Sequence, residues 1–351
     1  MTETGTDWRV VDGVATAWFD APSLTEGAVL AGRVVELSAE IAVDLRATGM
    51  RVRLDSGEHA EAGSAAARGL GLAADPAVLQ QLSVVLESAD PSVVRPFWRG
   101  VLDYVPAEDG GLADPLQRDP AMRIRPSTAT RSIWCRAGRS ARGPERPTGR
   151  RCSARWPASA PPRRRSSVTW PPQQRSWRTN AGFPLLVDLR PGLVVLDSGK
   201  DQWEDDAHGL VLDFTDLAGN LQSAARELGA VADPGLPRFV QVFLDAADVA
   251  AVRTFWVAAL GYTADRRDGL SDIHDPRRLN PELVFQELDA SETERRRQRN
   301  RIHVELAVPS DLAQTRLAAI VSAGGRLLDR SDDRWRVADP EGNELVIVSG
   351  A

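Results

Sequence analysis

The residues best suited to chemistry lie in the stretch RIHVELAV, where one residue separates His303 from Glu305. Side chains two apart in a strand point to the same side, so the imidazole and the carboxylate would face one environment. Such a pair could exchange protons with a ligand or help to hold a metal ion. The apolar residues of the stretch would pack on the opposite side and force the polar pair toward a cavity. These apolar residues are Ile302, Val304, Leu306 and Val308.

Glu344 is a third candidate because it opens the apolar stretch ELVIVS, which we expect to form a neighbouring strand. It would then lie close enough to His303 to share a ligand or a hydrogen bond. The alternative is that both side chains bond to each other or to the backbone in a metal-free pocket. The spacing of the residues leaves both possibilities open.

The elements that would position these residues follow a repeated order. The stretch 238–246 alternates like a strand, and a helix capped by Asp248 and ended by Gly261 follows it. Short strands are expected around 262–265 and 282–288. A second strand begins at RIHVELAV, followed by a helix over 311–325 and three strands, the last two joined by the turn-forming sequence DPEGN. The pattern predicts βαβββ twice within residues 237–350.

Paired βαβββ modules with RIHVEL opening one and DPEGNELVIV closing it resemble the vicinal oxygen chelate superfamily, which includes glyoxalase I, bleomycin-resistance proteins and extradiol dioxygenases. The resemblance implies an α+β fold in which paired βαβββ modules form a half-barrel. It also implies a small-molecule ligand and, in metal-dependent members, one divalent ion such as Fe, Mn, Ni or Mg. Carried over by motif, the metal ligands would be Gln241, His303 and Glu344, of which the last two would be catalytic. Glu305, Gln286 and Trp335 would contact the substrate.

The chain also contains a long internal repeat. VDLR occurs at 43–46 and again at 187–190, and AARGLGLAADP is matched by AARELGAVADP at a constant offset of 158 residues. Such a register indicates a tandem duplication. The first copy retains half of the glyoxalase-like region, over about 79–125, and Ser83 stands there at the position of Gln241.

Each copy begins with a small unit whose expected order is two strands, a helix, a hairpin and a second helix. Residues 7–74 resemble pterin-4a-carbinolamine dehydratase, and 182–232 resemble a shortened version, with small α+β modules built from antiparallel sheet and helices. The His-His-Pro signature of that family is missing before both hairpins. We therefore expect no dehydratase activity unless a carboxylate, Asp44 or Asp188, has taken the role of the histidines.

Residues 131–180 differ in composition from the rest of the chain. They carry 13 arginines and a single acid, Glu145, with very few aliphatic side chains. A basic arm for single-stranded nucleic acid and a solvated linker are two interpretations. We prefer a third, in which about 128–180 are translated out of frame, since the repeat breaks off here and resumes at GFPLLVDLR.

Composition sets the remaining expectations. The chain has 351 residues, a net charge of −6 and two cysteines, which argues against nucleic acid or an anionic membrane as the main partner and against a disulfide framework. Without a signal sequence or a long apolar run, a cytoplasmic location is expected, and a homo-oligomer is possible. The alternatives to a glyoxalase-like protein or enzyme are a pterin-dehydratase-related lyase and a non-catalytic ligand-sequestering protein. The expected divisions are 1–76, 77–127, the anomalous segment 128–181, 182–234 and 235–351.

Overall fold

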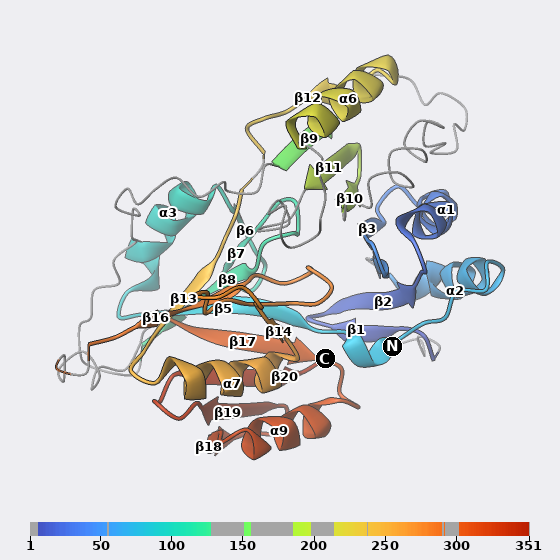
Figure 1. Cartoon of the computed structure of the whole chain (residues 1–351). Helices are drawn as coiled ribbons and strands as arrows, with labels where there is room; N and C mark the ends of the chain where they lie inside the picture. The colour runs from blue at the N-terminus through green and yellow to red at the C-terminus, as the bar shows by residue number, and fades with distance from the viewer. Residues whose placement is uncertain are drawn as a thin grey trace. The chain divides into compact units, whose positions relative to one another are not determined.

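The computed structural model describes residues 6–54, 56–127, 151–155, 185–197, 214–236, 238–289, 291 and 302–350. They fall into two compact units, drawn together in Figure 1. Unit 1 comprises 1–9, 14–79 and 140–238, and unit 2 comprises 10–13, 80–139 and 239–351. Both units combine helices with sheets, as expected for an α+β chain.

Unit 1 is built on an eight-stranded sheet. Its central pair joins the two VDLR copies in antiparallel register, with Asp44 opposite Asp188. Each copy also forms a hairpin with the strand that follows it. The strands, in sheet order, are β1 (Arg9–Val11), β2 (Val14–Asp20), β4 (Gly49–Leu54), β3 (Ala42–Arg46), β10 (Leu186–Arg190), β11 (Leu193–Asp197), β9 (Arg151–Arg155) and β12 (Val231–Ala232).

Helix α1 (Leu24–Val35) begins at a capping box, in which the Ser23 hydroxyl accepts from the Glu26 amide at 3.2 Å. It packs so closely on β3 that Gly27 has no room for a side chain. A Cβ there would lie 2.5 Å from Leu45 Cδ1 of β3. The helix ends at Val35, with Glu36 as its C-cap. The other helices of the unit are η1 (Gly57–His59), α2 (Ala60–Arg68), η2 (Pro76–Val78) and α6 (Phe214–Glu227).

One strand falls within the arginine-rich segment. Residues 151–155 form β9, which pairs with β11 and β12. The edge of the β10–β11 hairpin provides the backbone hydrogen-bonding partners for these five residues. The rest of 128–181, and with it the choice among the three interpretations, lies outside the described residues.

Unit 2 contains βαβββ in each of three chain segments. The order predicted for 237–350 is confirmed, and the same order occurs in the first half of the chain. The first module has β5 (Gln81–Ser88), α3 (Pro91–Leu102), β6 (Val105–Pro106), β7 (Leu112–Ala113) and β8 (Ala121–Pro126). The second has β13 (Val242–Ala246), α7 (Val249–Leu260), β14 (Thr263–Ala264), β15 (Ile273–His274) and β16 (Leu283–Glu287). The third has β17 (Ile302–Val308), α9 (Ala313–Ser322), β18 (Arg326–Arg330), β19 (Arg334–Ala338) and β20 (Glu344–Ser349).

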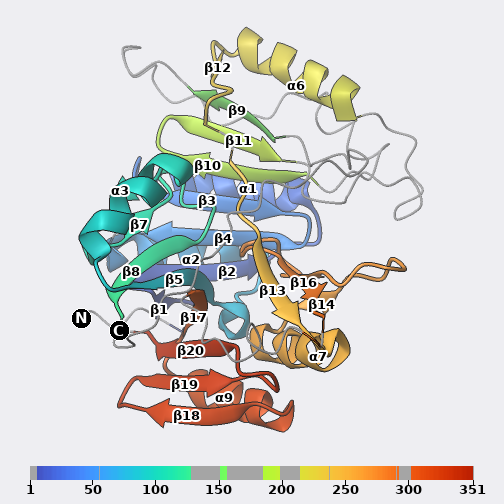
Figure 2. The same ribbon diagram turned by 90° about the vertical axis from the view of Figure 1, so that its left-hand side faces the viewer.

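The pairing of these modules differs from the expected half-barrel over 237–350. Strand β17 pairs with β5 of the first module, in antiparallel register from Ile302–Leu86 to Ala307–Gln81. The result is an eight-stranded sheet in the order β18-β19-β20-β17-β5-β8-β7-β6, part of which Figure 2 shows from the side. The second module keeps a separate four-stranded sheet, β13-β16-β15-β14. Strands β5 and β13 carry similar alternating apolar residues, so the pattern alone could not distinguish them as partners for β17.

The local signals in the third and second modules were predicted correctly. Asp248 caps α7 by accepting from the Ala251 amide at 3.0 Å, and Gly261 ends the helix at φ 64°. In the 339–343 turn, the Asp339 carboxylate accepts from the Asn343 amide at 2.9 Å. In the part of the chain that the structure describes, no helix is both long and apolar enough to cross a membrane.

One apolar core joins the sheets of unit 2. Phe255 and Trp256 of α7 are fully buried in it, together with Val304 and Leu306 of β17 and Leu82 of β5. The apolar side chains on one face of the eight-stranded sheet form part of this core. The polar side chains of its strands therefore lie on the opposite face.

Candidate functional site

Strand β17 places His303 and Glu305 on the side away from the core, as the alternation predicts. Val304 and Leu306 lie in the core cluster, whereas His303 and Glu305 stand opposite Val85 and Ser83 of β5. We call this side of the eight-stranded sheet the polar face. Both polar side chains are largely buried, at 8% and 4% exposure.

Three arginines converge on the Glu305 carboxylate. Arg334 Nη2 lies 2.6 Å and Arg125 Nη2 2.9 Å from Glu305 Oε2, and Arg123 Nε lies 3.4 Å from Oε1. Arg334 comes from β19 of the third module and the other two arginines come from β8 of the first module. We call these four residues the Glu305 cluster.

The arginines of the cluster differ in their other partners. Arg123 also pairs with Asp12 and with Asp109, the latter at 2.7 Å. Burial lowers the pKa of Arg123, but the three carboxylates outweigh it and raise the pKa above its ordinary value. For Arg125 and Arg334 the ion pair described is the one with Glu305, and their side chains are 38% and 31% exposed. These two guanidinium groups therefore reach both the buried carboxylate and solvent.

The remaining predicted residues of the polar face lie near the cluster. His303 Nδ1 is 3.9 Å from Glu87 Oε1, which is too long for a direct hydrogen bond. Glu344 precedes Leu345, the partner of Val304, so it lies on the strand next to His303. Glu344 Oε2 is 3.7 Å from Arg336 Nη1. The structure thus brings His303, Glu305 and Glu344 onto adjacent strands.

Three other predicted residues are placed elsewhere. Gln286 lies in β16 of the four-stranded sheet and Gln241 directly precedes β13 of the same sheet, whereas β17 belongs to the eight-stranded sheet. The family resemblance had grouped Gln241 with His303 and Glu344, and that grouping stays a prediction. Trp335 is 3% exposed in the apolar core, opposite Ile347, and does not lie on the polar face.

These residues do not fit the divalent ion that the family resemblance implies. Of the expected set, Gln241 directly precedes a strand of the other sheet, and Glu344 has a guanidinium as its charged neighbour. Among the described residues, no group of three His, Cys, Asp or Glu side chains is arranged to hold a metal. The arginines beside Glu305 would repel a dication.

The arginines of the polar face were not among the residues predicted from the sequence. Their signal is alternation: in AMRIR, Arg123 and Arg125 alternate with apolar residues, and in RWRVA, Arg334 and Arg336 do the same. A strand with arginine at every second position places those arginines on one face. That pattern was enough to find them, although not to show that they meet.

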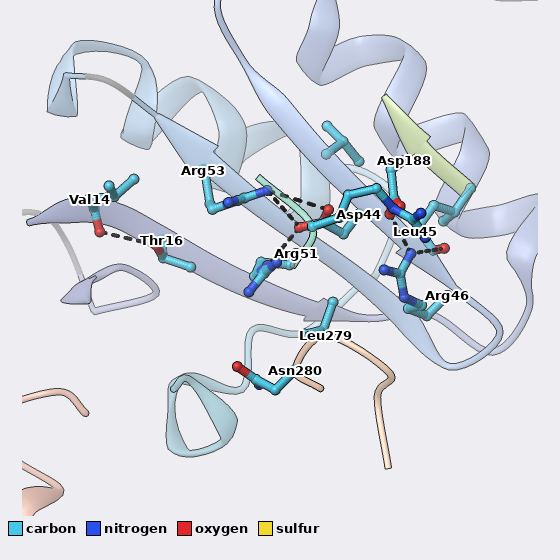
Figure 3. A network of polar contacts seen from close by, with 12 residues as sticks. Val14, Thr16, Asp44, Leu45, Arg46, Arg51, Arg53, Asp188, Leu279 and Asn280 are labelled. Atoms are coloured by element: carbon cyan, nitrogen blue, oxygen red, sulfur yellow. Dashed lines mark hydrogen bonds and ion pairs between the residues drawn. The ribbon is translucent and has the colours of Figure 1, made fainter. Parts of the chain in front are cut away.

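Unit 1 contains a second arginine–carboxylate cluster, shown in Figure 3. Asp44 contacts Arg51 Nε at 2.6 Å and Arg190 Nη2 at 2.5 Å, and Arg46 Nη1 contacts Asp188 at 2.7 Å. Arg46 and Arg190 thus make reciprocal pairs across the β3–β10 junction. We call this set, with Arg53, the Asp44 cluster.

Burial makes the Asp44 cluster unlike a catalytic site. Asp44 and Asp188 are 1% and 0% exposed. Burial alone would raise the pKa of Asp44, but the surrounding arginines hold it well below its ordinary value. Burial lowers the pKa of Arg53 to about 9, despite the attraction of Asp44. A carboxylate enclosed and neutralised in this way positions strands, and this geometry gives no support to Asp44 as a substitute for the missing histidines.

Comparison with known protein families gives a match within unit 2. Residues 241–348 match the family model described as a glyoxalase-like domain. No curated protein matches the sequence. Among solved structures, a glyoxalase/bleomycin resistance protein/dioxygenase family enzyme from Burkholderia phytofirmans is 14% identical, covers 32% of this chain and 97% of its own, and has a TM-score of 0.25.

Two further structures carry related names. A glyoxalase-related enzyme from Fulvimarina pelagi is 18% identical, with 32% of this chain and 88% of that one covered and a TM-score of 0.24. A glyoxalase I variant from Zea mays is 10% identical, with 79% and 95% covered and a TM-score of 0.36. Residues 241–348 are thus similar to a glyoxalase-like domain, and the match covers less than half of the chain.

Proposed function

We propose that the chain binds a small organic anion on the polar face of the eight-stranded sheet, with Arg125 and Arg334 as the anion-contacting groups. One observation carries the proposal: two arginines from different modules, each about a third exposed, share the single buried carboxylate of Glu305. In the ion pairs described above, the two guanidinium groups share this one carboxylate, and each also reaches solvent.

The geometry supports this role because the two arginines approach from opposite sides. In the sheet order, β19 lies two strands from β17 on one side and β8 lies two strands away on the other. Neighbouring strands are about 4.8 Å apart, so both side chains must lean across a strand to reach Glu305. A guanidinium has five N–H donors, and the contact to Glu305 uses only some of them. The remaining donors can bind a carboxylate or a phosphate in the planar, two-pronged manner typical of arginine.

Glu305 would hold the arginines in place before the ligand arrives. Preorganised groups lose less side-chain entropy on binding than free ones. His303 and Glu344, on the same face, are the groups that could exchange a proton with a bound ligand, and their catalytic role stays a prediction. The proposal assigns no reaction and no metal. The dehydratase and ligand-sequestering alternatives also remain predictions, for which the geometry offers no specific observation.

Isothermal titration with malonate tests the proposal, since malonate offers one carboxylate to each arginine. We expect binding to the full chain, and at least about tenfold weaker binding for Arg334→Gln, because a charged hydrogen bond contributes about 1.5–3 kcal/mol. Glu305→Gln should bind malonate more tightly than the parent, because its amide oxygen can still accept from the arginines and position them while the competing negative charge is gone.

Arg326→Gln is the matched control, because Arg326 is an exposed arginine of β18 outside the Glu305 cluster. Its affinity should equal that of the parent. Absence of binding to both the parent and Glu305→Gln would contradict the proposal, as would equal weakening by Arg326→Gln and Arg334→Gln.

A further inference from the structure

Arg123 differs from the other two arginines of the Glu305 cluster in how its guanidinium is used. Both of its terminal nitrogens contact acids outside the cluster: Nη1 lies 2.7 Å from Asp109 Oδ2, and Nη2 contacts Asp12. Its Nε lies 3.4 Å from Glu305 Oε1 and makes no hydrogen bond in the described part of the chain. The other two arginines reach Glu305 with Nη2. The terminal donors that bind a carboxylate in the two-pronged manner are therefore already occupied in Arg123.

Asp12 is held in place by a tight turn. Val11 ends β1 and Val14 begins the neighbouring strand β2, so Asp12 and Gly13 form a two-residue hairpin turn. Their φ angles are 51° and 78°, the left-handed conformation that an Asp-Gly pair adopts in such turns. Residues 10–13 belong to unit 2, as does Arg123. The turn thus supplies one fixed carboxylate to the guanidinium.

Asp109 is held by a second turn, between β6 and β7. Its Oδ1 accepts from the Gly111 amide at 2.8 Å, while its Oδ2 accepts from Arg123. Gly111 packs directly on β8, because a Cβ there would lie 2.8 Å from the Met122 carbonyl oxygen. Two separate turns therefore each supply one carboxylate to the same guanidinium.

These contacts also reduce the access of Arg123 to solvent. Its side chain is 17% exposed, whereas those of Arg125 and Arg334 are about a third exposed. A ligand on the polar face that approached Arg123 would have to displace a carboxylate that is already bound in place. The guanidinium of Arg123 is thus close to Glu305, but its terminal donors are not offered to a ligand.

We propose that Asp12 and Asp109 set the charge preference of the anion site by withholding Arg123 from the ligand. This inference rests on the proposed function, in which Arg125 and Arg334 contact the anion. With two guanidinium groups available, the site takes a dianion such as a dicarboxylate, and a third carboxylate on the ligand adds no affinity. The two aspartates are positioning residues, which act through Arg123 and do not touch the ligand.

Isothermal titration of the full chain with malonate and with tricarballylate, a tricarboxylate, tests the inference. Asp12→Gly should raise the affinity for tricarballylate at least about tenfold more than the affinity for malonate, which is the gain expected from one further charged hydrogen bond. Glycine keeps the left-handed turn and removes the carboxylate. Each ligand is compared with itself across variants, so the difference in ligand shape cancels.

Asp109→Ser should produce the same shift in preference, through the other terminal nitrogen of Arg123. A serine hydroxyl can still accept from the Gly111 amide, so the turn retains its hydrogen bond. This variant carries the test if Asp12→Gly does not fold. Asp268→Ser is the matched control, because it removes the same charge from an exposed position of unit 2. Its preference between the two ligands should equal that of the parent.

The double variant Asp12→Gly, Arg123→Gln should lose the gain, since the released guanidinium is its source. A gain that survives this second substitution would contradict the inference. If malonate binds the parent and neither Asp12→Gly nor Asp109→Ser shifts the preference toward tricarballylate, the charge preference is wrong while the proposed function stands. If malonate binds neither the parent nor Glu305→Gln, the proposed function fails and this inference fails with it.

Discussion

At the scale of single residues, the two arginine–carboxylate clusters differ in solvent access. The arginines that contact Asp44 are at most 11% exposed, whereas Arg125 and Arg334 are about a third exposed. A buried charge needs its partners in place to remain charged, and removing one partner leaves the others unpaired. We therefore assign stability to the Asp44 cluster and ligand contact to the Glu305 cluster.

Asp44→Asn should destabilise the chain by about 3–5 kcal/mol, the usual cost of breaking a buried ion pair. The substitution keeps the size of the side chain but leaves the enclosing arginines without their carboxylate. Urea denaturation measures the change. Glu40→Gln, an exposed acid of the same unit, is the control and should shift stability by less than about 0.5 kcal/mol. Equal effects of the two substitutions would argue against the structural role.

Asp265 gives a prediction about pH. Hydrogen bonding from Arg267 lowers its pKa from 3.8 to about 2, against the opposing effect of burial. A carboxyl whose folded pKa is depressed stabilises the fold above its unfolded pKa, and this contribution disappears as pH falls through the folded value. The Asp265→Asn variant should therefore lose less stability than the parent between about pH 4 and pH 2. Denaturation across this range checks it, with the exposed Asp268→Asn expected to behave like the parent.

At the scale of elements, sequence patterns predicted what is local and failed where partners had to be chosen. The capping Asp248, the stop at Gly261 and the turn at 339–343 depend on neighbouring residues, and all three are confirmed. The face of β17 that His303 occupies followed from its alternation. The strand beside β17 did not, because β5 and β13 offer equivalent apolar faces. The contribution of the β8 arginines to the polar face was missed for that reason.

Asp248→Ala should lower stability by about 1 kcal/mol, since the helix α7 then loses the side chain that accepts from its free Ala251 amide. The control is Thr254→Ala within the same helix, where the exposed hydroxyl donates to the Ala250 carbonyl and no terminal amide depends on it. Thermal unfolding of both variants provides the comparison. A loss from Thr254→Ala as large as that from Asp248→Ala would indicate a general helix effect and not a cap.

At the scale of the whole molecule, the number of βαβββ modules differs from the number that the long repeat predicts. The described part of the chain has three βαβββ segments, while the long repeat leads one to expect an even number. The segment 128–180 stands where a fourth would fall, and the hypothesis of out-of-frame translation offers a reason for its composition.

That hypothesis is tested by reading the nucleotide sequence of this segment in its other two frames. We expect one frame to encode a strand of the form R-x-x-H-hydrophobic and, further on, a turn resembling G-N-E. The turn motif is read from 342–344 of the third module, and the strand motif resembles RIHV at 301–304, which has one residue fewer between the arginine and the histidine. If neither frame contains them, the arginine-rich composition belongs to the protein as translated, and the linker and nucleic-acid interpretations become the ones to examine.

The reciprocal pairs of the Asp44 cluster have a consequence for how the chain can change over generations. Arg46 neutralises Asp188 and Arg190 neutralises Asp44, so each VDLR copy supplies the counter-ion of the other. Deleting either copy would leave a buried charged side chain of the other copy without its counter-ion. Neither VDLR stretch can therefore change independently of the other. Substitutions at Asp44 and Arg190 are expected to occur together, as are those at Arg46 and Asp188.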